Sequence, residues 1–118
     1  MIFGAHIIIF SQDADADRAF LRDVLHFNSV DVGGGWLVFA LPPAEVALHP
    51  GPENGNHELL LITDDLAGEM ATLQELGIEC SEVEEPMWGS VTRIGLPGGG
   101  EVALYQTKLP LALTRTQP

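Results

Sequence analysis

Two stretches of the chain repeat each other at a spacing of 51 residues, and they decide the fold. Residues 6–27 read HIIIFSQDADADRAFLRDVLHF, and residues 57–78 read HELLLITDDLAGEMATLQELGI. Each stretch opens with a histidine and a short apolar run, residues 7–10 or 59–62, that has the length and composition of a buried strand. Apolar residues at helical spacing follow in both. The sequence therefore predicts a strand and then a helix in each half.

The ends of both helices are marked by residue types with known capping roles. Asp13 and Asp64 are the candidate N-caps, because a short carboxylate accepts hydrogen bonds from the free amides of the first helical turn. Gly77 follows the second helix and suits a left-handed stop. His26 holds the matching place in the first half.

The repeat continues beyond the helices. Residues 36–50 (WLVFALPPAEVALHP) correspond to residues 91–106 (VTRIGLPGGGEVALYQ), with a turn that differs by one residue. Each half is thus predicted as βαβββ, with hairpin connections at the glycine-rich residues 33–35 and 97–100. We expect residues 1–118 to form a single domain built from two repeats, about 2–49 and 56–108.

Composition excludes several classes of partner. The chain of 118 residues has 17 acidic against 5 basic residues, a formal net charge of -12, and 46% hydrophobic residues. A core can form, but no basic patch is available for nucleic acid or for an anionic membrane surface. The single cysteine, Cys80, forms no internal disulfide, and no apolar run has the length of a membrane span. The expected location is the cytoplasm.

These features together resemble the vicinal oxygen chelate superfamily, which includes glyoxalase I, extradiol dioxygenases and bleomycin-resistance proteins. In many members a half begins with histidine, has aspartate at the eighth place and ends its helix with Leu-Gly-Phe. The resemblance covers about residues 2–108. The matching residues are His6, Asp13 and Leu25–Phe27, then His57, Asp64 and Leu76–Ile78, and near the end Trp88-Gly89 and the turn Leu96–Gly100.

The resemblance implies an α+β fold in which two βαβββ modules form a cupped, mixed, eight-stranded sheet around a pocket. Catalytic members hold one divalent ion there, which implies that His6 and His57 are metal ligands. The family's carboxylate ligand corresponds to Ala103, so Glu101, two residues or roughly 6.6 Å earlier on the same strand face, is the candidate third ligand. The ion would be Zn, Ni, Mn or Fe. The alternative is that both histidines only line the pocket.

Acidic and aromatic residues on the two last strands are further pocket candidates. Glu45 is the first-half equivalent of Glu101, and either carboxylate is a displaced ligand, a general base or a solvated residue. His49 and Tyr105 share strand faces with Glu45 and Glu101, where they either bind a ligand or end a strand at the surface.

Two tryptophans and one arginine complete the candidate pocket. Trp36 and Trp88 offer flat faces for an aromatic or cationic ligand, with ordinary core packing as the alternative. Arg93 either clamps a ligand carboxylate or pairs with one of the many acids.

Three functions fit this sequence. The first is a metal-free protein that sequesters a small molecule, a cationic aromatic compound in view of the negative charge. The second is a metal-dependent lyase, isomerase or extradiol-type dioxygenase that acts on vicinal oxygens, with Glu101 as ligand or base. The third is a degenerate module that only contacts other proteins. In each case the resemblance implies a homodimer.

Overall fold

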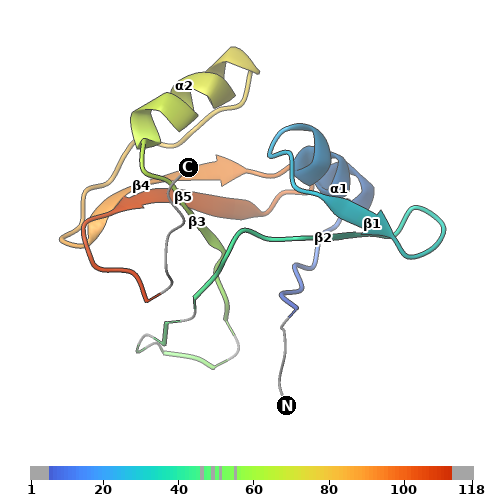
Figure 1. The fold of residues 1–118 in the computed structure, drawn as a ribbon, viewed down its shortest axis with the longest axis horizontal. Helices are drawn as coiled ribbons and strands as arrows, with labels where there is room; N and C mark the ends of the chain where they lie inside the picture. The colour runs from blue at the N-terminus through green and yellow to red at the C-terminus, as the bar shows by residue number, and fades with distance from the viewer. Residues whose placement is uncertain (1–5, 46, 49, 51, 55, 113–118) are drawn as a thin grey trace.

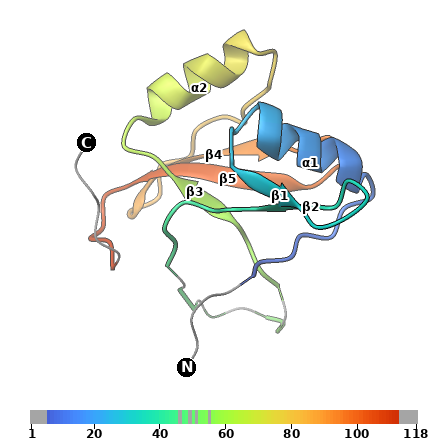
Figure 2. The ribbon, with the colours of Figure 1, turned by 45° about the vertical axis from the view of Figure 1, so that its right-hand side comes forward.

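The computed structural model describes residues 6–45, 47–48, 50, 52–54 and 56–112. Both helices lie on one side of the strands, and the connection from β2 to β3 runs on the other side (Figures 1 and 2). No helix in the described ranges is long and apolar enough to cross a membrane. The predicted α+β class is confirmed by the order of elements: α1 (Ala14–Asp23), β1 (Ser29–Asp31), β2 (Leu37–Phe39), β3 (Leu60–Ile62), α2 (Leu66–Glu75), β4 (Gly89–Gly95) and β5 (Glu101–Thr107).

The second half has the order β3, α2, β4 and β5, and residues 80–84 form only isolated bridges where a further strand was predicted. Its sheet has the order β3-β5-β4, in which β5 runs parallel to β3 and antiparallel to β4. Isolated bridges from Cys80 to Ile94 and from Glu84 to Val91 add residues 80–84 along the outer edge of β4. A backbone hydrogen bond of 2.8 Å from the amide of Leu96 to the carbonyl of Gly100 closes the turn between β4 and β5.

One face of this sheet carries the core. Ile94 and Val102 are opposite each other in the β4–β5 register and are 0% and 1% exposed. They pack with residues from both helices, so this is the helix side of the sheet. Because side chains alternate along a strand, the neighbouring residues point to the opposite side, which we call the open face. The buried core consists of Phe20, Leu66, Leu73, Ile94, Leu96, Val102 and Leu104.

The first half is less complete than predicted. β1 and β2 pair antiparallel around the turn at residues 33–35, as expected. Residues 7–10, however, are not a strand, and Ile8 and Phe10 are 72% and 92% exposed. In the second half the equivalent strand pairs with β5, whereas residues 44, 45, 47 and 48 form no strand here. Without that neighbour, residues 7–10 have no ladder to join, and the prediction of a strand there was wrong for the single chain.

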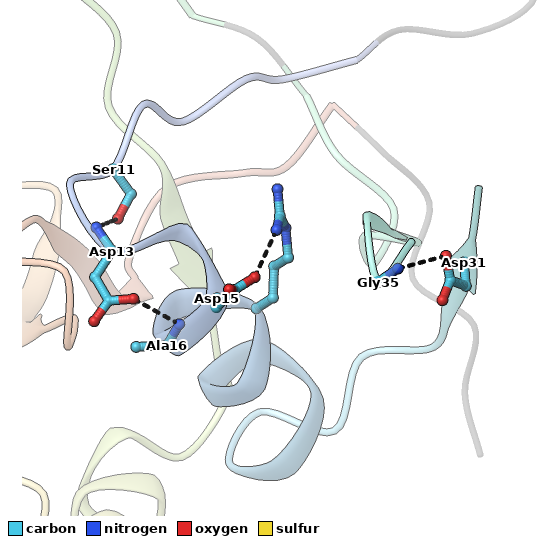
Figure 3. A network of polar contacts seen from close by, with 7 residues as sticks. Ser11, Asp13, Asp15, Ala16, Asp31 and Gly35 are labelled. Carbon is cyan, nitrogen blue, oxygen red and sulfur yellow. Dashed lines mark hydrogen bonds and ion pairs between the residues drawn. The ribbon is translucent and has the colours of Figure 1, made fainter. Parts of the chain in front are cut away.

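The helix caps confirm one prediction and correct another. Asp13 caps α1, and its carboxylate accepts a hydrogen bond of 3.2 Å from the amide of Ala16 (Figure 3). The cap of α2 is Asp65 and not Asp64. The hydroxyl of Thr63 accepts from the Asp65 amide at 3.1 Å, and this local turn moves the helix start one residue onward.

The positions that end the two helices are equivalent, as the repeat predicts. Gly77 follows α2 with φ 78, and His26 follows α1 with φ 60. A non-glycine residue rarely adopts this left-handed conformation. The matching backbone shows that His26 holds the place of Gly77 even though its side chain is poorly suited to it.

A buried carboxylate joins the first helix to the second half. Asp17 of α1 is 9% exposed, and its Oδ1 accepts a hydrogen bond of 2.7 Å from the amide of Gly98 in the turn between β4 and β5. A side chain at Gly98 would collide with Ser11 and would lie 2.8 Å from Asp17 Oδ2. Sequence reasoning did not single out Asp17, so this link was missed.

Candidate functional site

Several predicted pocket residues lie together on the open face. Arg93 is opposite Ala103 in the β4–β5 register, and Tyr105 and Glu101 lie two residues to either side of Ala103. Side chains two residues apart on a strand share a face, and diagonal cross-strand neighbours, about 7–8 Å apart, are within reach of long side chains. Arg93, Glu101 and Tyr105 therefore face the same space, on the side away from both helices.

An aromatic pair closes one end of this group. The rings of Trp88 and Tyr105 meet edge to face, with centroids 5.3 Å apart and planes at 81°. The backbone carbonyl of Trp88 accepts a hydrogen bond of 2.9 Å from the amide of Lys108, so the residue before β4 is held beside the end of β5. Both aromatic side chains are half-buried. We call Trp88, Arg93, Glu101 and Tyr105 the open-face group.

Glu45 brings the first half to the same place. Burial raises the pKa of the Tyr105 phenol, and the negative charge of Glu45 raises it further. The carboxylate of Glu45 also accepts a hydrogen bond of 2.7 Å from the amide of Ala112. Because a raised pKa keeps the phenol protonated, Tyr105 is a hydrogen-bond donor over the whole neutral range.

Arg93 differs from the other arginines of the described chain. Arg18 is paired with Asp15 at 3.0 Å, and Arg22 with Asp23 at 2.7 Å. The half-buried Arg93 has no ion pair with any residue that the structure describes. Of the two predicted roles, pairing with a nearby acid is thus not observed among these residues, and binding to a ligand carboxylate remains.

Trp36 is not part of the open-face group. The guanidinium of Arg18, a residue of α1, lies 4.5 Å from the centre of its ring. Trp36 directly precedes β2, next to the turn between β1 and β2, and that turn and the start of β4 lie at opposite ends of the molecule (Figures 1 and 2). One face of the Trp36 ring is therefore in contact with a cation of the protein itself, and the residue is 62% exposed.

The three predicted metal ligands do not come together in the single chain. No group of three or more His, Cys, Asp or Glu residues in the described ranges has the geometry to hold an ion, and His6, His57 and Glu101 are all described. His57 precedes β3 and is exposed, whereas Glu101 is on the open face of β5. In the single chain these residues do not fit a metal centre.

Two other predicted positions have different outcomes. His49 lies outside the described residues. Ala103, which stands where the family has its carboxylate, is 1% exposed and forms the floor of the open face between Arg93 and β3. A methyl group therefore stands, covered by its neighbours, where the family has its carboxylate.

A hollow lies beyond the end of α2, away from the open face. It has a volume of about 410 Å³ and is lined by Gln74, Gly77, Ile78, Glu79 and Cys80. Burial raises the pKa of the Cys80 thiol, so the thiolate is disfavoured there. This hollow contains none of the residues predicted to bind a ligand.

Comparison with known proteins identifies relatives by structure. No protein-family model matches the chain. No curated protein matches it either. A lactoylglutathione lyase from Agrobacterium tumefaciens is 20% identical, with a TM-score of 0.62 over 83% of this chain and 88% of that one.

Two structures from Streptomyces sp. CB03234 are more similar in sequence. TnmS3, an antibiotic binding protein, is 26% identical, with a TM-score of 0.60 over 88% of this chain and 100% of that one. A glyoxalase/bleomycin resistance protein is 27% identical, with a TM-score of 0.57 over 81% and 93%. The fold predicted from the repeat is thereby confirmed.

Proposed function

We propose that this chain, which has the fold of the vicinal oxygen chelate superfamily, is a small-molecule-binding protein that sequesters a planar aromatic compound on its open face. The observation that carries the proposal is the pair Trp88 and Tyr105, half-buried and in edge contact on the open face. The similarity to an antibiotic binding protein, 26% identical over the whole of that chain, supports it.

The chemistry of the open face favours a flat ring. Tyr105 and Trp88 already meet edge to face, and an aromatic ring of a ligand can pack against either of them. Such an aromatic pair has its ring centroids about 4.5–7 Å apart and contributes about 0.5–1.5 kcal/mol beyond the area that it buries. Ala103 presents only a methyl group between the two neighbouring strands. A planar compound on this face thus gains contact with an aromatic side chain, while Ala103 adds no bulk beneath it.

The net charge of the protein acts at longer range. A formal charge of -12 raises the concentration of cations near the molecule, which is why the sequence favours a cationic compound. That field is screened over about 8 Å at physiological ionic strength. It acts mainly on the approach of a ligand, whereas the contacts on the open face determine what is held.

Binding of 2-naphthamide, a neutral planar probe, tests the proposal. With about 13 non-hydrogen atoms at about 0.3 kcal/mol each, the expected Kd is on the order of 1 mM. Trp88→Ala is expected to weaken it about tenfold, because the aromatic wall is lost. Ligand-observed NMR titrations measure both.

Trp36→Ala is the matched control, because it removes the same side chain at the far end of the molecule. Equal losses in the two variants, or no binding to the native protein, would contradict the proposal. Absence of all binding would instead favour the degenerate module.

We further propose that the protein is a homodimer in the cytoplasm. The first half leaves large apolar side chains open to water, among them Phe10 at 92%, Val30 at 63% and Leu48 at 89% exposure. Exposed apolar side chains that gather into one patch mark interfaces, and a second copy of the chain would cover these. The expected mass by light scattering at micromolar concentration is twice the 12.7 kDa of one chain. The mass of a single chain would contradict this.

A further inference from the structure

One cation of the open face, Arg93, has no ion-pair partner within the part of the chain that the structure describes. Arg93 is half-buried in β4 and makes no ion pair with the described residues, in a chain with 17 acidic against 5 basic residues. Glu101 is its diagonal neighbour on the same face, and yet no ion pair forms between them. A partly buried guanidinium is stabilised by an anionic hydrogen-bond partner, and no described acid supplies one here. An anionic group of a ligand can therefore take that place.

We infer that Arg93 anchors an anionic oxygen of the ligand, a carboxylate or an enolate attached to the planar ring, while the ring itself lies toward Trp88 and Tyr105. This inference rests on the proposed function, because it concerns the same face and the same ligand. It names the substrate class more closely: an aromatic compound with a single acidic oxygen group.

The order of residues along β5 fixes the direction of the ligand. Arg93 is level with Ala103, whereas Tyr105 and the adjacent Trp88 are two residues further on. The planar guanidinium matches two oxygens at once, and the protonated phenol of Tyr105 adds a second donor from the diagonal position. Glu45, whose charge acts on Tyr105, disfavours a second anionic group at the aromatic end.

Three probes of nearly equal size test the inference: 2-naphthoate, 2-naphthamide and 2-naphthylmethylammonium. Naphthoate is expected to bind roughly tenfold more tightly than naphthamide, in line with a charge-assisted hydrogen bond at a partly exposed site, and the ammonium probe more weakly than either. In Arg93→Gln the affinity for naphthoate is expected to fall until it is about equal to the affinity for naphthamide.

Arg22→Gln is the control, since it changes the net charge equally but removes an arginine that is paired with Asp23 on the surface of α1. It is expected to keep the tenfold preference. A native protein that binds acid and amide equally would overturn the inference, as would a tenfold ratio that persists in Arg93→Gln.

The two proposals fail differently in this experiment. In one outcome, the native protein binds the amide as tightly as the acid, and Trp88→Ala weakens that binding. This result would support the aromatic site and contradict the role of Arg93. Lack of binding by all three probes overturns both proposals together.

Discussion

Replacing Ile94 with alanine is expected to lower the free energy of unfolding by about 2–5 kcal/mol. Ile94 is 0% exposed and is the most deeply buried member of the core between the sheet and the two helices. Truncation removes three methyl or methylene groups from a site whose walls come from several elements and collapse only partly. Urea unfolding followed by tryptophan fluorescence measures the loss, at matched protein concentration because a dimer is also stabilised by association.

Ile62→Ala is the control for this substitution, since it makes the same truncation on the other side of the sheet. Ile62 is in register with Tyr105 on the open face and is 39% exposed. We expect a loss of only about 1 kcal/mol there. Equal losses at the two positions would contradict the assignment of one face to the core and the other to ligand binding.

Replacing Gly98 with alanine is expected to cost about 2–4 kcal/mol, the sum of overpacking and of a strained or broken hydrogen bond to a carboxylate. The new Cβ would collide with Ser11 and lie 2.8 Å and 3.1 Å from the oxygens of Asp17. The same carboxylate accepts the amide of Gly98 at 2.7 Å, so it has no room to withdraw without losing its partner. The turn and α1 would have to move apart.

Gly100→Ala in the same turn is the matched control. Its Cβ would meet only a methyl group of Leu96, at 4.0 Å, which is ordinary contact. We expect a change within about 0.5 kcal/mol, as for most surface substitutions. If Gly98→Ala proved as stable as Gly100→Ala in urea unfolding, then the link between Asp17 and this turn would not contribute to stability.

The regular elements were predictable where local pattern and tertiary partners agree. The helices and the hairpin of β4 and β5 carry their own signals, apolar spacing and a glycine-rich turn, and each meets a neighbour that buries its apolar side. Residues 7–10 carry the same strand signal as residues 59–62. They differ because β5 pairs with β3, while no strand forms at the described residues of 44–48. Pairing depends on a partner that composition does not reveal.

The arrangement of the candidate site residues was predictable only in part. Alternation along the last strand correctly placed Tyr105 with Glu101, and Trp88 and Arg93 then joined them through the register of β4. Trp36 has the same chemistry as Trp88, but Arg18 comes to lie on it because α1 packs over the β1–β2 hairpin. Asp17 gave no signal at all, because one buried carboxylate in a row of acidic residues has no distinguishing pattern.

The most direct test of the central claim is where on the protein a planar aromatic compound binds. Titration of the 15N-labelled protein with 2-naphthoate, followed through backbone and indole N–H signals, locates the contact. The account predicts the largest shifts at Trp88, Arg93, Ala103 and Tyr105, on the open face of β4 and β5. Largest shifts at Trp36, or in the hollow lined by residues 74 and 77–80, would contradict it.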